Sequence, residues 1–423
     1  MRIPRFLRFE KYEVIDLKEF ISDGRIDIYL KRNGQSARCN RCRSDLGVQR
    51  GHYSVKVEAM SIMGLRTFIH FQRYKGHCDR CKKARTEHLP WVSELTPHYT
   101  AEFAWWVGRI CEIASVSRVA ELVSHDKSTT WRLDYHRMVA MLQHYKIPKA
   151  KKLSVDEVYA RKRSRFYGES REKKYFTVIT DVETRKVIWV NDGRSKEALD
   201  QFYRIIGKEA CANIEVVAMD QFDGYRASTE EHCPQASVVL DRFHIIKRFE
   251  EILNDTRRYL HDLLPPGDRL RRITRSSNKF NFMKRADRRS ASEARDLEEV
   301  MKENHDFVKL EFIKERVLSL FDQPDATQAL FVWTEIGDWV RYPLFFELKN
   351  WYDNLNKDWK CVCNYFDHRV TTAVSEGINN VIKTLKKKAY GYRNMNYFKL
   401  KIMQVCGYLN SRFIPSPEFK HLH

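Results

Sequence analysis

The sequence contains no apolar run that approaches the ~18 residues needed to cross a bilayer, so we expect no membrane-spanning segment. The residues after its basic N-terminus are not apolar enough to form a secretory signal. No glycine-rich, phosphate-cradling loop is present, which gives no reason to expect ATP as a ligand. The ten cysteines lack the density of a disulfide framework, so we expect a reducing compartment, the cytoplasm.

Acidic residues are the scarcer charge. The chain has 56 Asp and Glu against 76 Lys and Arg, a formal net charge of +20. Such an excess requires a polyanionic partner, for which nucleic acid is the usual candidate and a membrane surface the other. The 423 residues, 43% of them hydrophobic, are enough for two to four domains with real cores.

Two Cys-x-x-Cys pairs, separated by two strand-like runs, indicate a zinc ribbon within residues 1–96. The pairs are Cys39 with Cys42 and Cys78 with Cys81. Each pair spaces two thiolates for one tetrahedral Zn²⁺, and two pairs complete a closed, structural site. Four unrelated thiols are the alternative. Basic residues in and around the pairs, Arg41 and Arg80 among them, are expected to face DNA phosphates.

Residues 97–146 have helical spacing. One helix is predicted at 101–113, a second at 116–123, and a third near Ser128, with Asp126 or Ser128 as its N-cap. This order fits a helix-turn-helix whose last helix enters the major groove, although any small three-helix domain gives a similar pattern. The residues expected to contact DNA there are Lys127, Ser128, Thr130 and Arg132.

Residues 150–244 carry an ordered set of strands and two acids. A strand at 153–160, with nearly alternating polarity, contains Asp156; two more strands, a helix and a fourth strand ending at Asp220 follow. A second helix and a fifth strand complete the order of an RNase H-like fold, in which the first and fourth strands are neighbours. Asp156 and Asp220 can then share a metal. A surface strand with paired charges is the alternative for 153–160.

The strand pattern disappears over residues 245–368, which we interpret as a helical insertion with an aromatic core. Residues 269–285 within it carry seven Lys or Arg and no acid. This basic run is expected to face phosphates, with a disordered linker as the alternative.

A basic helix follows the insertion. We predict a buried stripe of Val374, Ile378, Val381 and Leu385. The opposite face is predicted to carry Glu376, Asn380, Lys383 and Lys387. One carboxylate beside an amide and two lysines suits a metal ligand next to DNA phosphates, and a surface glutamate paired with lysine is the alternative.

Asp156, Asp220 and Glu376 together suit two-metal phosphodiester chemistry. Two Mg²⁺ (or Mn²⁺) ions activate the attacking oxygen and stabilise the leaving oxygen. Mg²⁺ prefers hard oxygen ligands and keeps several waters, so three carboxylates suffice. No nucleophilic Ser, Cys or Tyr is required.

These features occur in an order that resembles the ISL-type insertion-sequence transposases, a bacterial group of DDE transposases. The resemblance extends from residue 39 to about residue 402. It rests on both Cys-x-Arg-Cys knuckles, Val155-Asp156-Glu157, Met219-Asp220 before Gly224-Tyr225, Asp241-Arg242-Phe243-His244, and Ser375-Glu376-Gly377-x-Asn379-Asn380-x-x-Lys383 running into Ala389-Tyr390-Gly391-Tyr392-Arg393-Asn394.

The resemblance implies that Asp156, Asp220 and Glu376 are the catalytic triad. It implies an enzyme that binds terminal inverted repeats, cleaves there with divalent metal, and joins the freed 3′-hydroxyls to target double-stranded DNA. Holding both ends requires at least a homodimer, and such a protein works at the bacterial nucleoid. A non-catalytic DNA-binding regulator and a stand-alone RNase H-like nuclease are the alternative functions.

The expected fold is therefore a multidomain α+β chain, in which an RNase H-like domain is interrupted by the all-helical insertion. That domain comprises residues 150–244 and 369–410, and residues 411–423 form a tail. Glu157, Asp181 and Asp223 are rival acids; Glu157 faces the other side of its strand. Asp241 and His244 are possible auxiliary ligands, and Arg393 is a further candidate DNA contact.

Overall fold

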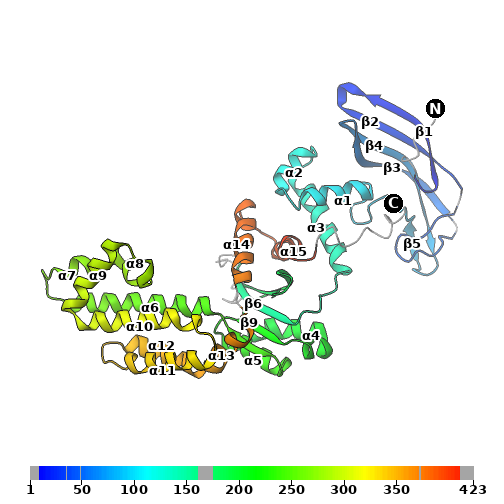
Figure 1. Ribbon diagram of the computed structural model, residues 1–423. Coiled ribbons are helices and arrows are strands. Elements are labelled where there is room, and N and C mark those ends of the chain that lie inside the picture. Colours follow the sequence, from blue (N-terminus) through cyan, green and yellow to red (C-terminus); the bar gives the residue numbers. More distant parts are fainter. Residues whose placement is uncertain (1–8, 35, 48, 161–174, 371–372, 410–423) are drawn as a thin grey trace. The chain divides into compact units, whose positions relative to one another are not determined.

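The computed structural model describes residues 9–34, 36–47, 49–160, 175–370 and 373–409. It is a mixed α+β structure, as predicted, and the chain divides into two compact units (Figure 1). The first unit comprises residues 1–146 and 384–423, and the second comprises residues 147–383. Within the described residues, no helix is both long and apolar enough to span a membrane.

The first unit begins with a sheet built around a long hairpin. Its strands are β1 (Tyr12–Phe20), β2 (Arg25–Arg32), β3 (Gln49–Ile62), β4 (Leu65–Cys78) and β5 (Lys83–Thr86), and they pair in the order β1-β2-β4-β3 with β5 on β4. Met63 and Gly64 both have positive φ, the backbone of the tight turns that join antiparallel strands. The Cys78–Cys81 knuckle connects β4 to β5, and Cys39 of the other knuckle pairs with Glu87, just after β5.

Three helices follow the sheet and confirm the predicted helical segment. They are α1 (Ala101–Ile110), α2 (Val116–Leu122) and α3 (Lys127–Gln143). Asp126 is the N-cap of α3, because its side chain accepts a hydrogen bond of 2.8 Å from the Thr129 amide. Thr130 is fully buried and its hydroxyl donates to the Asp126 carbonyl, so this side chain does not present itself to DNA as expected.

The last helix of the first unit, α15 (Met395–Val405), is bound to α3 by a buried ion pair. The Lys401 ammonium lies 3.2 Å from Asp134 Oδ2 and donates to the Cys111 carbonyl at 2.6 Å. The Tyr397 hydroxyl donates to the same Asp134 oxygen at 2.6 Å. A buried charge is costly unless it is paired, so these contacts fix α15 on the three helices.

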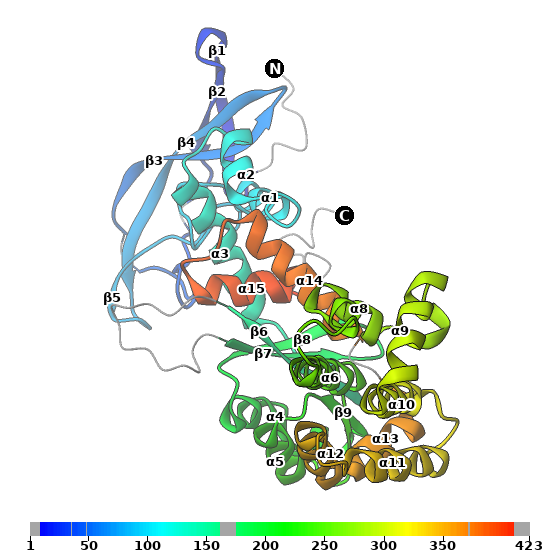
Figure 2. The same cartoon turned by 90° about the vertical axis from the view of Figure 1, so that its left-hand side faces the viewer.

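The second unit contains a five-stranded sheet with the predicted strands. They are β6 (Lys152–Tyr159), β7 (Tyr175–Asp181), β8 (Lys186–Asp192), β9 (Val216–Met219) and β10 (Ser237–Leu240), in the order β10-β9-β6-β7-β8. β6, β9 and β10 are parallel, whereas β7 runs antiparallel to its neighbours. The first and fourth strands of this sheet are neighbours, as predicted. Helices α4 (Lys196–Ala212) and α5 (Asp223–His232) lie together beside the sheet (Figure 2).

An all-helical segment follows β10, as predicted. Its helices are α6 (Arg242–Leu263), α7 (Leu270–Thr274), α8 (Lys279–Met283), α9 (Ala291–Glu303), α10 (His305–Ser319), α11 (Ala326–Val340), α12 (Phe346–Lys357) and α13 (Trp359–His368). Buried aromatic side chains, Trp333 and Trp351 among them, form its core together with Val239 of the sheet. On α13, Asn364 donates to the Val238 carbonyl at 2.8 Å, so the segment returns to the sheet edge.

Part of the basic run at 269–285 is paired within the helical segment. Arg269 pairs with Glu299 and Glu303 of α9, and Arg285 pairs with Asp322 just after α10. The run contains no acid of its own, but distant helices supply several. These pairs hold the helical segment together, whereas Arg272 and Arg275 of the same run are exposed, so a phosphate-facing role for them stays a prediction.

Helix α14 (Ala373–Lys388) carries Glu376. Its buried side chains are Ser375, Ile378 and Ile382. Val381 is 43% exposed, so its predicted place in the buried stripe is wrong. The buried face is displaced by one residue because Ser375 packs on β6, where its hydroxyl lies 2.7 Å from that of Ser154.

Candidate functional site

In the second unit, three residues that pair across the parallel strands β6, β9 and β10 are each followed in the chain by an acid. The acids are Asp156, Asp220 and Asp241. Val155 pairs with Met219, and Met219 pairs with Leu240, so each acid comes one residue after a paired position. Residues in register on neighbouring strands point to the same face, so Asp156 within β6 lies level with the two acids that follow the ends of β9 and β10. The sheet therefore gathers the three carboxylates, two of which had been predicted to share a site.

Asp156 is held from two sides and is only 8% exposed. Its Oδ1 accepts from the Glu157 amide at 2.6 Å, and its Oδ2 accepts from the Asn379 side-chain amide of α14 at 2.6 Å. Burial, together with the charge of Asp220, raises the pKa of Asp156 to about 6. A bound cation would favour the ionised carboxylate at this position.

His244 joins the other two acids. Its Nδ1 lies 2.7 Å from Asp220 Oδ1 and 2.6 Å from Asp241 Oδ2. The hydrogen bonds to Asp220 and Asp241 raise the pKa of His244 to about 10, so it is a cation between two carboxylates. Asp241 also caps α6, because it accepts from the Phe243 amide at 3.1 Å. The three residues lie close enough together to hold one metal ion, and His244 would ligate such an ion only as a neutral imidazole.

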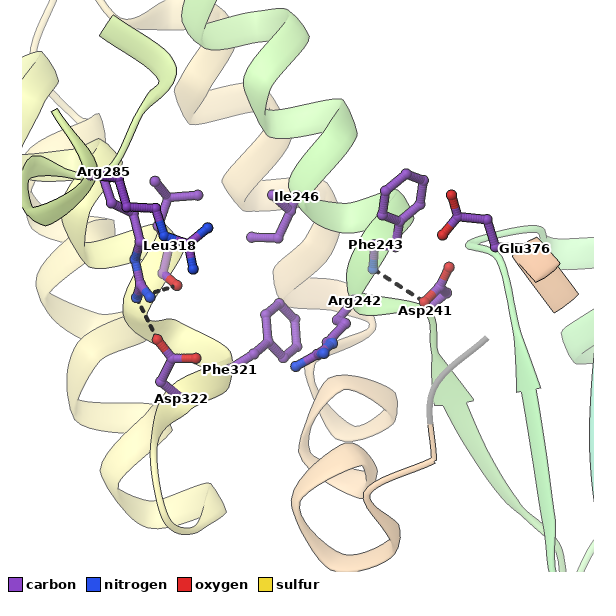
Figure 3. Close-up of a pocket in the computed structure, with 10 residues that line it drawn as sticks. Asp241, Arg242, Phe243, Ile246, Arg285, Leu318, Phe321, Asp322 and Glu376 are labelled. Carbon is purple, nitrogen blue, oxygen red and sulfur yellow. Dashed lines mark hydrogen bonds and ion pairs between the residues drawn. The ribbon is translucent and has the colours of Figure 1, made fainter. Parts of the chain in front are cut away.

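Glu376 is exposed at the start of α14 and lines a cavity of about 340 Å³ together with Asp241 (Figure 3). Its side chain points toward the Asp241 end of that cavity (Figure 3). Neither Glu376 nor Asp156 lies within the compact group formed by Asp220, Asp241 and His244. The structure thus brings Asp220, Asp241 and His244 into one group, and the predicted ligands Asp156 and Glu376 lie outside that group.

The rival acids have other partners. Glu157 pairs with Arg194 at 3.1 Å. Asp181 accepts from the Thr184 hydroxyl at 2.7 Å and from the Glu183 amide at 3.0 Å, which closes the turn after β7. The Asp223 side chain is 89% exposed and pairs with Arg226 at 2.8 Å. These contacts agree with turn and surface roles.

Two residues near the acids were missed by the sequence reasoning. Asn379 donates to Asp156 and lies within the Ser375–Lys383 segment that carries the family resemblance, so this segment indicates a role for Asn379. Asp358, at the start of α13, is 8% exposed and accepts from the Gln221 side chain at 2.6 Å. Nothing in the sequence connects Asp358 with Gln221, because 137 positions separate them.

The four predicted cysteines meet in the first unit. Their sulfurs lie within 4.8 Å of one another, with 3.9 Å between Cys39 and Cys81 and 3.4 Å between Cys42 and Cys78. A tetrahedron with Zn–S bonds of about 2.3 Å has edges of about 3.8 Å, so the spacing fits Zn²⁺. All four thiols are free, and the Arg41 amide donates to Cys39 Sγ at 3.4 Å. The donor set suits a closed site.

The candidate DNA contacts, other than Thr130, are exposed. They are Arg41, Arg80, Lys127, Ser128, Arg132, Asn380, Lys383, Lys387 and Arg393. Arg132 also donates to the Thr129 hydroxyl at 3.1 Å, which orients it at the start of α3.

Comparisons with known proteins identify the family of the chain. The family pattern of ISL3-type DDE transposases, described as transposase, matches residues 153–402. The chain is 26% identical to the transposase for insertion sequence element IS1001 of Bordetella parapertussis, over 89% of this chain and 90% of that one. It is 23% identical to the transposase for insertion sequence element IS1557 of Mycobacterium tuberculosis, over 53% and 55% of the two chains. Enzymes of this class act on DNA and generally use divalent metals. The chain therefore belongs to the ISL3-type DDE transposases.

Proposed function

We propose that this transposase cleaves DNA at the terminal inverted repeats of a bacterial insertion sequence and joins the freed ends to target DNA. The observation that carries the proposal is the register of β6, β9 and β10, which brings Asp156 of β6 level with Asp220 and Asp241 after β9 and β10. The strand order and the helical insertion after β10 support an RNase H-like domain.

The acids of this site supply the ligands for divalent metal. Asp156, Asp220 and Glu376 offer the hard oxygens that Mg²⁺ or Mn²⁺ prefers. Bound there, the ions would activate the attacking oxygen and stabilise the leaving oxygen. Asn379 and the Glu157 amide orient Asp156. His244 holds the carboxylates of Asp220 and Asp241 beside each other, in an auxiliary role.

The first unit supplies DNA recognition in this proposal. Zn²⁺ held by Cys39, Cys42, Cys78 and Cys81 would fix the two knuckles, and α2 with α3 would act as a helix-turn-helix. Ser124, between these helices, has φ of 54°, which makes a tight connection. The exposed basic side chains of the knuckles and of α3 then contact phosphates. Two element ends must be held together, so the active form is at least a homodimer.

The direct test is strand cleavage with Mg²⁺ on labelled DNA that carries the terminal repeats of the element. We expect cuts at the repeat tips by the native protein. Glu376→Gln should keep end binding and lose cleavage by about 100-fold or more, because a ligand charge is removed from the transition state. Equal cleavage by both proteins would remove Glu376 from the proposed triad.

The role of Asp241 can be separated from its role as a helix cap. Asn caps a helix as well as Asp does, so Asp241→Asn should keep the cap of α6 and lower the melting temperature only through its lost ion pair with His244. The loss of its charge beside His244 and Asp220 should slow cleavage by about 10- to 100-fold, the usual effect of altering groups that orient metal ligands. An unchanged rate would leave Asp241 with a capping role alone.

A further inference from the structure

The cavity beside Glu376 extends away from the acids into the helical segment. Its volume is about 340 Å³, which lies at the small end of sites that hold organic ligands. Residues from the start of α6, from the stretch 285–288 and from the end of α10 line it. All of these belong to the second unit. The proposed metal chemistry uses only the end that carries Asp241 and Glu376.

The middle of the cavity is apolar. Ile246 is partly buried and Phe321 is 5% exposed, and they form its wall. Phe243 is 50% exposed, although it follows a buried acid, and its ring lies between Glu376 and Ile246 (Figure 3). An exposed ring at the mouth of an apolar cavity offers a flat stacking surface.

The far side of the cavity carries arginines in two different states. Arg285 is fixed, because it donates to the Leu318 carbonyl at 2.9 Å and pairs with Asp322. Arg288 is exposed and forms no ion pair with any acid in the described ranges. Its charge is therefore available to an anionic ligand. An aromatic surface on one side of the cavity and an available guanidinium on the other match a nucleotide, with its base and its phosphate.

We propose that this cavity receives one unpaired nucleotide of the DNA end that is being cut. Its base stacks on Phe243 over the Ile246 and Phe321 wall, and Arg288 contacts its phosphate. A base that stays in the duplex stack cannot enter a concave pocket of this size, so the nucleotide leaves the helix when the end docks. The inference rests on the proposed function, because it takes the scissile phosphate to lie at the neighbouring acids.

The test measures end-DNA affinity by fluorescence anisotropy in Ca²⁺, with native protein and Phe243→Ala. Loss of one aromatic–base stack should weaken binding by about 5- to 150-fold. The same comparison is repeated with an abasic site at each position near the junction in turn. At one position the effect of Phe243→Ala should vanish, because no base remains to stack there. Phe331→Ala, which removes an exposed ring from α11, is the matched control and should change nothing.

Two further variants guard against a structural effect of Phe243→Ala, since its ring also contacts His244. Phe243→Tyr keeps the stacking surface and should restore native affinity. Arg288→Gln should reduce the slope of log affinity against log salt by about 0.7 to 0.9, the loss of one phosphate contact. An effect of Phe243→Ala that is equal on intact and abasic DNA would overturn the pocket. Native protein that fails to prefer repeat ends over random DNA would instead overturn the proposed function.

Discussion

Replacing Asp220 with asparagine should abolish strand cleavage while end binding persists. The substitution keeps the shape of the side chain and removes the charge that would hold metal beside Asp156. Metal stabilisation of the transition state is worth several kcal/mol, and each ~1.4 kcal/mol is tenfold in rate. We therefore expect a loss of about a thousandfold or more, measured with Mg²⁺ on labelled repeat DNA, and a dissociation constant within about threefold of native.

Asp223→Asn is the matched control for this experiment. It removes the same charge three residues later, from a side chain that is 89% exposed. It should cleave at the native rate. If Asp220→Asn also cleaved at that rate, the ligand set would have to be rebuilt around Asp241. If the native protein bound repeat ends without cutting them, a DNA-binding regulator would be the better description.

Removal of zinc should unfold the knuckles of the first unit. The buried residues of their apolar cluster are Ala37, Cys39, Leu46 and Cys78, with Cys42, Tyr74 and Cys81 packed against them, and this cluster is too small to be stable alone. Structural zinc binding contributes about 10–16 kcal/mol in small zinc modules at neutral pH. A zinc-selective chelator, or Cys81→Ser, should therefore abolish specific binding to the repeat ends. The cooperative unfolding transition of this region should also disappear, because the region is then already unfolded.

The zinc experiment needs a cysteine control and a metal count. Cys363→Ser, which alters a partly buried thiol on α13, should keep both zinc and end binding. Native protein should contain one zinc per chain by atomic absorption. Native protein that is free of zinc but binds repeat ends normally would contradict a structural metal.

The order of strands could be predicted because each strand in the second unit has its own apolar pattern. That order placed Asp156 beside Asp220, and the register of β10 added Asp241. The cysteine site could be predicted because ligand spacing is local and reflects tetrahedral geometry. In both cases the decisive information lies within one element or between neighbouring ones.

The predictions that were wrong concern residues whose burial or hydrogen bonds depend on how the helix packs in the folded protein. Val381 and Ile382 are both apolar, and only the contact of α14 with β6 decides which one is buried. Threonine is a residue type that can contact DNA, yet the Thr130 hydroxyl donates to the Asp126 carbonyl, one turn earlier in the same helix. In the basic run at 269–285, Arg269 and Lys284 pair with acids of α9, so only other residues of the run stay available to phosphates.

The position of α14 in the chain has a consequence for inheritance. The boundary between the two units falls at Lys383 and Thr384, inside one continuous helix that begins near Glu376. Lys401 of α15 is bound to Asp134 of α3. A genetic exchange that replaced residues 1–146 alone would separate these partners and leave a buried charge uncompensated. Because the proposed function places end recognition in the first unit, a new end specificity would be acquired intact only when residues 1–146 and the segment that carries α15 are inherited together.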